Sequence, residues 1–222
     1  MSFNPSWADL LARASTTPAK ICLELSVLHL QNDPYRAFVG LVARGLDFSI
    51  QCMARDKNVL QGLSEDQLTV VLLGPLKGMT FDASHDTNTG GHCDVVIDGP
   101  DEMLWLGEAK KYTSYTKLLG GFRQLMDRYA TGTPQQSDGG MIIYSFEAST
   151  NEIMAQWRSY LEEAETIQIT DVPTRPLEFI STRAHVGTGQ PITVRHTPVV
   201  LFHRPTDTEK PPKRTRRAKE SS

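Results

Sequence analysis

The stretch from Gly90 to Tyr112 reads GGHCDVVIDGPDEMLWLGEAKKY. Two short apolar runs, at about 94–98 and 103–110, flank a turn rich in Gly, Pro and Asp, which is the pattern of a β-hairpin. Asp94 opens the first run, and Glu108 and Lys110 close the second. We therefore expect an antiparallel hairpin with these charged residues gathered at one end.

The pairing register decides whether the charged residues meet. Side chains two residues apart share a face of a strand, so Glu108 and Lys110 should project together. Asp94 faces the same way if it pairs with Glu108, which leaves a three-residue loop, Pro100–Glu102. A register of Asp94 with Gly107 would put the two acids on opposite faces of the sheet.

Two carboxylates that share a face beside a lysine indicate a cation site. At about 4 Å they repel by about 4 kcal/mol at an effective dielectric constant near 20, so a divalent cation between them would be stabilising. Oxygen ligands from few protein groups suit magnesium, which keeps several waters and shares its shell with phosphates.

Asp94, thirteen intervening residues and Glu108-Ala109-Lys110 resemble the PD-(D/E)xK nuclease superfamily, although Cys93 stands where the motif has proline. The resemblance covers roughly Ser64 to Phe146. It implies an α/β (α+β mixed sheet) fold with a restriction-endonuclease-like core, a central mixed β-sheet flanked by helices. It also implies that Asp94, Glu108 and the Ala109 carbonyl bind Mg²⁺, with Mn²⁺ as an alternative, and that Lys110 serves the nucleophilic water. The glycine-rich opening and the helix after the hairpin are similar to nuclease domains of bacterial antiviral defence systems.

Two further catalytic candidates come from the same resemblance. Glu65 lies on the helix before the hairpin, where many members carry an additional acid near the metal. Several members carry Gln-x-x-x-Tyr on the next helix, whereas four residues separate Gln124 from Tyr129 here. We therefore read Tyr129 as a core residue, and Gln124, with Arg128 one turn later, as a contact to metal-bound water or phosphate.

Flanking elements are predicted from capping and periodicity. Asp33 caps a helix with Pro34 at its first position, and Ser64 with Gln67 forms a capping box. We expect that second helix to end before Gly74-Pro75. The further expected elements are a strand over 78–81, a helix over 116–131, a buried strand over 141–146, a helix over 151–164, and strands over 177–182 and 192–202. Gly120-Gly121 either precedes the helix proper or permits a close approach by another segment.

The chain divides into three predicted regions: an N-terminal helical extension over 1–62, a nuclease-like domain over 63–204, and a disordered tail over 205–222. The tail carries six Lys or Arg against three Asp or Glu, while the whole chain has a net charge of −3. The three cysteines are widely spaced, which favours reduced thiols, and His92-Cys93 lacks the other ligands of a zinc site. We expect no membrane span and a cytoplasmic protein.

These features predict a magnesium-dependent DNA endonuclease, a hydrolase of phosphodiester bonds that acts in phage defence or repair. It would work as a homodimer or as a defence-complex subunit. Two alternatives stay open, a catalytically inactive subunit of the same fold that binds nucleic acid or acts as a scaffold, and an RNA-directed phosphodiesterase. Nothing in the sequence encodes recognition of particular bases.

Overall fold

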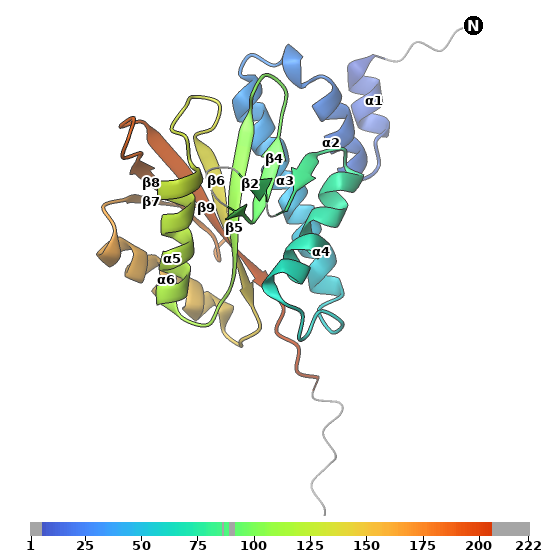
Figure 1. Cartoon of the computed structure of the whole chain (residues 1–222). Coiled ribbons are helices and arrows are strands. Elements are labelled where there is room, and N and C mark those ends of the chain that lie inside the picture. Colours follow the sequence, from blue (N-terminus) through green and yellow to red (C-terminus); the bar gives the residue numbers. More distant parts are fainter. Residues whose placement is uncertain (1–5, 86, 89–91, 206–222) are drawn as a thin grey trace, which may run out of the picture.

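A mixed sheet of seven strands in the order β1-β4-β5-β6-β9-β8-β7 forms the centre of the protein in the computed structural model, which describes residues 6–85, 87–88 and 92–205 (Figure 1). The central strands β5, β6 and β9 are parallel, and the remaining neighbours are antiparallel. The predicted mixed sheet flanked by helices is thus confirmed. The strands are β1 (Asp82–Ser84), β4 (Val95–Asp98), β5 (Leu104–Lys111), β6 (Asp138–Ser145), β7 (Gln168–Asp171), β8 (Phe179–Ala184) and β9 (Pro191–Val200), with β2 (Thr87–Asn88) and β3 (His92–Cys93) as a separate pair.

Helices cover both faces of the sheet, and the sheet separates the core into two clusters. Buried residues of α3 and α4 pack on one face with Ile97, Trp105 and Ile142, and those of α5 and α6 pack on the other with Leu106 and Met141. The helices are α1 (Trp7–Arg13), α2 (Thr17–Ser26), the short 3₁₀ helix η1 (Leu28–Leu30), α3 (Pro34–Arg55), α4 (Glu65–Gly78), α5 (Tyr115–Gln124), the π-helical η2 (Leu125–Tyr129) and α6 (Thr150–Ala164).

The hairpin of β4 and β5 has the register that the site requires. Val95 pairs with Gly107, so the next position outward sets Asp94 opposite Glu108. Gly99 N donates to Met103 O at 2.8 Å and closes the predicted loop over residues 100–102. The register prediction is confirmed.

The start of α4 is as predicted, but its end is not. Ser64 Oγ accepts from Gln67 N at 3.2 Å, and Ser64 N donates to Gln67 Oε1 at 2.9 Å. The helix then continues through Pro75 to Gly78, so the predicted end before Gly74 is wrong. Pro75 lacks an N–H, which normally disfavours a helix interior. Here Leu76 is fully buried and packs against Gly45 of α3, where a Cβ would lie only 2.7 Å from Leu76 Cδ2, so tertiary packing outweighs the propensity.

Two strand predictions are also corrected. Residues 78–81 are a helix end and a turn, with Thr80 at φ 66°, and the strand begins at Asp82. Strand β7 was not predicted because it is a mostly exposed edge strand with little apolar patterning. The other predicted helices and strands are present within a few residues of their expected limits.

The N-terminal helices share the core of the sheet. Phe38, Leu41, Val42 and Leu46 of α3 belong to one buried cluster with residues of β4, β5 and β6. Among the described residues, α3 is the one helix whose length and composition would suffice to cross a membrane. Its Arg44 nevertheless forms an ion pair with Glu24 of α2.

Candidate active site

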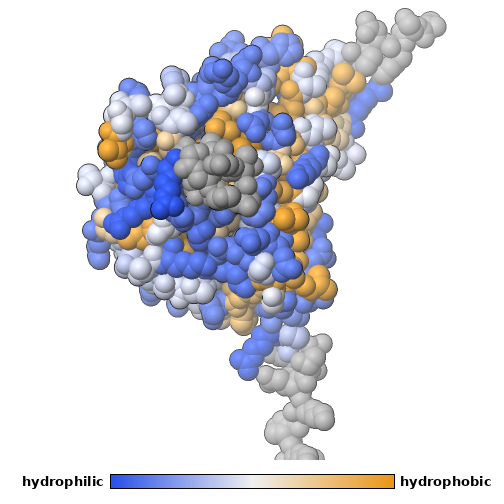
Figure 2. All heavy atoms as spheres, viewed as in Figure 1, coloured by the Kyte–Doolittle hydropathy of each residue, from blue (hydrophilic) through white to orange (hydrophobic). Residues whose placement is uncertain are grey.

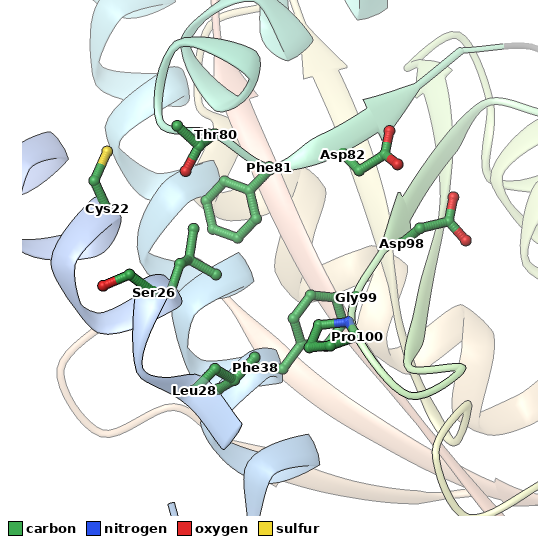
Figure 3. A pocket seen from close by; sticks show the side chains of 11 residues that line it. Cys22, Ser26, Leu28, Phe38, Thr80, Phe81, Asp82, Asp98, Gly99 and Pro100 are labelled. Carbon is green, nitrogen blue, oxygen red and sulfur yellow. The ribbon is translucent and has the colours of Figure 1, made fainter. Parts of the chain in front are cut away.

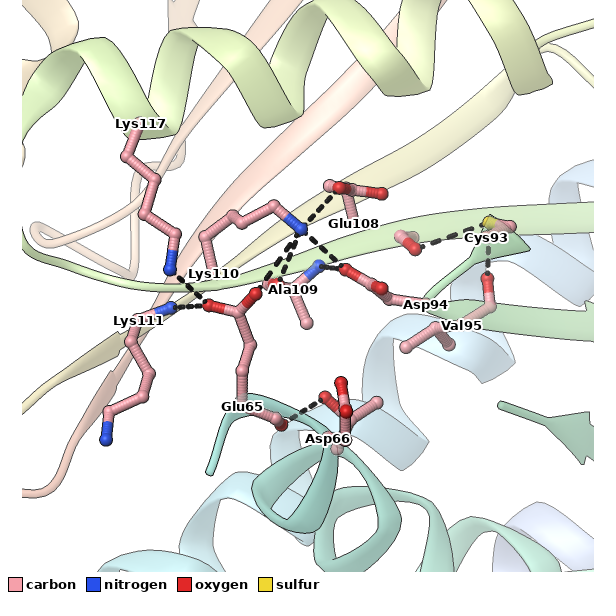
Figure 4. A network of polar contacts seen from close by, with 12 residues as sticks. Glu65, Asp66, Cys93, Asp94, Val95, Glu108, Ala109, Lys110, Lys111 and Lys117 are labelled. Atoms are coloured by element: carbon pink, nitrogen blue, oxygen red, sulfur yellow. Dashed lines mark hydrogen bonds and ion pairs between the residues drawn. The ribbon is translucent and has the colours of Figure 1, made fainter. Parts of the chain in front are cut away.

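Four oxygen atoms surround the Lys110 ammonium at the end of β5 (Figure 4). Its Nζ lies 2.5 Å from Glu108 Oε1, 3.0 Å from Asp94 Oδ2 and 3.5 Å from Glu65 Oε1. It also donates to Ala109 O at 3.3 Å. The structure therefore brings together four predicted catalytic residues and the predicted carbonyl ligand. We call Glu65, Asp94 and Glu108 the carboxylate cluster.

Asp94 is fixed through both its side chain and its backbone. Its Oδ2 accepts from Ala109 N at 2.9 Å as well as from Lys110. Its carbonyl accepts from His85 Nδ1 at 2.7 Å, and His85 Nε2 lies 3.9 Å from Asp66 Oδ1. His85 is thus a hydrogen-bonded loop residue, while Asp86 and the side chain of His92 lie outside the described residues.

Glu65 joins three elements at the site. It occupies the first position of α4, and its Oε2 accepts from Lys111 N of β5 at 2.6 Å and from Lys117 Nζ of α5 at 2.8 Å. Burial would raise the pKa of Glu65, but these hydrogen bonds and the charges of Lys110 and Lys117 lower it below its ordinary value. Glu65 is therefore held ionised between α4, β5 and α5.

Glu108 is the most buried member of the carboxylate cluster, with 2% of its side chain exposed. Burial above all, followed by the charge of Asp94, raises its pKa to about 7 despite the opposing effect of Lys110. Its Oε2 is buried without a hydrogen-bond partner within the described part of the chain. One Glu108 oxygen thus contacts the ammonium while the other is free to accept a proton or a cation.

Lys110 is held as a cation. Burial would lower its pKa, but the charges and hydrogen bonds of Glu108 and Asp94 raise it above its ordinary value. With 12% of its side chain exposed, the ammonium is largely shielded from solvent screening. At neutral pH it is a donor and a positive charge, not a base.

Of the two neighbouring glycines Gly120 and Gly121 in α5, only Gly121 is required by close packing. A Cβ at Gly121 would lie 3.0 Å from Lys110 Cγ and 3.2 Å from Glu108 Cγ, whereas a Cβ at Gly120 would meet nothing within 4 Å. The helix therefore includes both glycines, and Gly121 permits the close approach of two site side chains.

The polar stripe of α5 faces the same end of the sheet. Lys117 bonds to Glu65, Gly121 packs on Lys110, and Gln124 follows one turn later on this stripe. Gln124 is half-buried, and Arg128 is exposed. Among the described residues neither is hydrogen-bonded to the carboxylate cluster, so their predicted contact to water or phosphate stays a prediction.

Cys93 does not belong to the site chemistry. Its buried Sγ donates to Val95 O at 3.4 Å and to Gly107 O at 3.5 Å, and burial raises its pKa to about 12. A neutral, internally bonded thiol is a poor metal ligand. Cys22 and Cys52 are free as well, in agreement with the expected reduced thiols.

The oxygen atoms around the Lys110 ammonium belong to donor groups of the kind that bind divalent cations. Two carboxylates and a carbonyl are donors that Mg²⁺ accepts while it retains several waters. In the described part of the chain, no three His, Cys, Asp or Glu side chains form a group ready to bind a metal ion. The ammonium stands where Asp94, Glu108 and Ala109 converge, so a metal ion would require Lys110 to move outward. The unpartnered Glu108 Oε2 is the atom that such an ion would satisfy.

A hollow of about 410 Å³ lies away from this cluster, between α2 and the β1–β4 edge (Figure 3). Its wall includes Asp82 and Asp98, which are register partners on neighbouring strands. Burial, followed by the charge of Asp82, raises the pKa of Asp98. None of the described residues that line this hollow is a lysine or an arginine, so it lacks the paired carboxylate and ammonium groups of the Lys110 site.

The sequence did not single out two groups that support the site. Lys117 lies 52 positions after its partner Glu65, so their contact depends on how α5 docks against α4. Lys111 contributes its backbone N–H to Glu65, and its Nζ donates to Leu63 O at 2.9 Å. Backbone donors leave no signal in side-chain patterns.

No family model, curated protein or solved structure matches this chain. Inference about function therefore rests on the geometry and chemistry of the site.

Proposed function

We propose that this protein is a magnesium-dependent endonuclease that hydrolyses phosphodiester bonds in DNA with a PD-(D/E)xK-type site. The observation that carries the proposal is the convergence of Asp94, Glu108 and the Ala109 carbonyl on one point beside Lys110. The order α4, β1, β4, β5, α5, β6 agrees with the restriction-endonuclease-like core that the sequence motif implies.

Asp94, Glu108 and the Ala109 carbonyl would hold Mg²⁺, or Mn²⁺ in its place. When bound, such an ion polarises the phosphodiester and lowers the pKa of a bound water. Glu65 adds a third carboxylate at 3.5 Å from the same ammonium and is anchored by Lys111 and Lys117. Its part in the proposal is to keep α4 and α5 in position on either side of the site.

Lys110 would act on the substrate as a hydrogen-bond donor. Its raised pKa keeps it protonated at neutral pH. A preorganised cation in a largely buried site stabilises negative charge that develops on phosphate, and its N–H groups can orient the attacking water. Gln124 and Arg128 are proposed to contact phosphate or water from the adjoining turns of the helix.

A cleavage assay tests the proposal. Supercoiled plasmid, linear DNA and RNA are incubated with the full chain and Mg²⁺, beside Glu108→Gln and Lys110→Ala, with the exposed Glu163→Gln as control. Nicking of DNA that requires Mg²⁺, persists in the control and falls by at least about 100-fold in both site variants is the expected result. A mobility shift without cleavage supports the inactive scaffold instead, and loss of RNA alone supports the RNA-directed phosphodiesterase.

The biological setting is proposed on the sequence resemblance alone, as a cytoplasmic enzyme of phage defence or repair. Cutting both strands of a duplex needs two sites, which favours a homodimer or a larger defence complex. Light scattering with and without duplex DNA would show whether two copies assemble.

A further inference from the structure

A second cavity lies on the opposite face of the sheet from the Lys110 site. It encloses about 250 Å³ between α3 and strands β5, β6, β8 and β9. Arg36, Gly40 and Ala43 line it from the helix, and Trp105, Asp138 and Ile180 line it from the sheet. Trp105 and Ile142 belong to the buried cluster under α3 and α4, whereas Leu106 belongs to the cluster under α5.

Small residues keep this cavity open on both walls. A Cβ at Gly40 would meet nothing within 4 Å, so α3 leaves space there. On the sheet, a Cβ at Gly140 would lie 2.6 Å from Trp105 Cζ2, so the absence of that side chain lets the indole lie across β6. Trp105 therefore contributes an aromatic side chain to the cavity wall. Since an apolar cavity of about 150 Å³ can hold one benzene ring, this one can hold a ring with a short polar arm.

The charges around the cavity leave one group incompletely neutralised. Arg195 is already paired with two carboxylates. Its Nε donates to Glu178 Oε2 at 2.7 Å, and one of its terminal nitrogens donates to Asp47 Oδ1 at 2.8 Å. Asp138 has only 8% of its side chain exposed, yet its ion pair is with Arg36 at 3.7 Å, and 72% of the Arg36 side chain is exposed.

The remaining contacts of Asp138 leave room for a cation. Its Oδ2 accepts from Ser137 Oγ at 3.2 Å, and its backbone N donates to the Tyr35 hydroxyl at 2.8 Å. Burial, with a smaller contribution from the charge of Asp33, raises the pKa of Asp138 in spite of Arg36 and of hydrogen bonds from Ser137 and Tyr35, so these partners together do not compensate for its burial. A buried carboxylate gains most from a partner that is itself shielded from water.

We propose that this cavity binds a small planar aromatic cation, with the ring against Trp105 and an amidinium-like or protonated amino group on Asp138. The ligand's cation takes the place of the exposed Arg36 guanidinium. This site is separate from the proposed hydrolytic site and does not depend on it.

Benzamidine, which has one ring and one amidinium, is a suitable probe. We expect it to shift the backbone amide signals of Gly139 and Gly140 and the indole signal of Trp105 in an NMR titration of the full chain. Benzoate, which has the same ring with the opposite charge, should bind at least tenfold more weakly. Benzoate binding as tightly as benzamidine would overturn the proposal, because the anchor would then be arginine.

Two variants locate the site. Asp138→Asn removes the charge, and Gly40→Leu fills the open space, so each should weaken benzamidine binding at least tenfold. Gly120→Leu, at another helical glycine with open space, is the control and should bind as the wild type does. Unchanged binding in either cavity variant, or no benzamidine binding to the wild type at millimolar concentration, would overturn the proposal.

Glu108→Gln separates this inference from the proposed function. It should bind benzamidine like the wild type while losing cleavage, so either proposal can fail alone. Loss of benzamidine binding in this variant would place the probe at the Lys110 site and overturn the cavity proposal.

Discussion

At the scale of single residues, Glu108 concentrates the electrostatics of the site. Its folded-state pKa of about 7 lies above its ordinary value of 4.5, mainly because of burial and then because of Asp94. The folded protein therefore binds an extra proton between these two values. The corresponding stabilisation is fully present below pH 4.5 and is lost as pH rises through about 7.

Glu108→Gln should remove this dependence. We expect the free energy of unfolding of the variant, relative to the wild type, to rise between pH 5 and pH 8 by on the order of 2 kcal/mol. Urea denaturation at both pH values measures it, with the exposed Glu163→Gln as the matched control. Parallel pH dependences of Glu108→Gln and the wild type would contradict the raised pKa.

His196 should give the opposite slope. It is fully buried and stacks on Phe179 at 4.3 Å between ring centroids. Trp157 Nε1 donates to its Nδ1 at 3.1 Å, so Nε2 carries the proton and donates to Ser181 Oγ at 2.8 Å. This neutral ring has both nitrogens bonded, and burial lowers its pKa to about 3.

Because its pKa is lowered, His196 makes the folded protein less stable in acid. The unfolded chain takes up the proton near pH 6.5, whereas the folded protein resists it down to about 3, so stability present above 6.5 is lost as pH falls. The loss approaches about 1.4 kcal/mol per pH unit. His196→Gln should be less stable than the wild type at pH 7, because its amide fits the aromatic site poorly, but should lose less on going to pH 4.5. Equal losses in denaturation experiments would rule out a neutral His196.

The sequence could predict that Asp94, Glu108 and Lys110 share one face of the hairpin, because side chains alternate between the two faces of a strand. The pairing of Asp94 with Glu108 puts their side chains on the same face, and a three-residue loop fixes this pairing. It could not predict that Lys110 Nζ would stand at the centre of the oxygens, since that depends on a rotamer and on the height of α5 above the sheet. Gly121 permits the close approach of α5 to Lys110 and Glu108.

At the scale of secondary-structure elements, α5 offers a matched pair of substitutions. Alanine normally stabilises a helix interior by about 1 kcal/mol relative to glycine. Gly120→Ala should show this gain, because its Cβ would meet nothing within 4 Å. Gly121→Ala should instead lower stability and cleavage activity, because its Cβ would press on Lys110 and Glu108. Thermal unfolding and the plasmid assay measure both effects, and equal effects of the two variants would show that α5 is not constrained by the site.

The end of α4 shows where element prediction fails. Local rules correctly give its start, since Ser64 and Gln67 satisfy each other's backbone N–H groups. They misplace its end, because the cost of Pro75 is local whereas the burial of Leu76 against α3 is a long-range effect. The unpredicted β7 fails for the same reason, as pairing with β8 outweighs its polar sequence.

At the scale of the whole molecule, charged residues connect α3 to β9 and to the segment between β7 and β8. Asp47 of α3 accepts from Arg175 and Arg195, and Glu178 accepts from the same two arginines. This network sits beside the cavity under α3, while the carboxylate cluster lies on the other sheet face. The view in Figure 2 is largely hydrophilic over α5, with hydrophobic residues gathered at α4, where Val70 and Val71 are exposed.

The basic residues of the C-terminal segment are expected to contribute to DNA binding. Residues 205–222 carry six Lys or Arg, and those after Pro205 lie outside the described part of the structure. Each phosphate neutralised by a basic residue adds about 0.9 to the slope of log K against log salt concentration. Ending the chain at Pro205 should therefore weaken binding to duplex DNA at low salt and reduce that slope by up to about five. Fluorescence anisotropy measures both quantities when salt is varied from about 50 to about 200 mM, where this effect is large. Because the Lys110 site is built from residues far from this segment, the Mg²⁺-dependent cleavage that we propose should be retained at saturating DNA. An unchanged affinity and slope would mean that residues after Pro205 do not contact DNA.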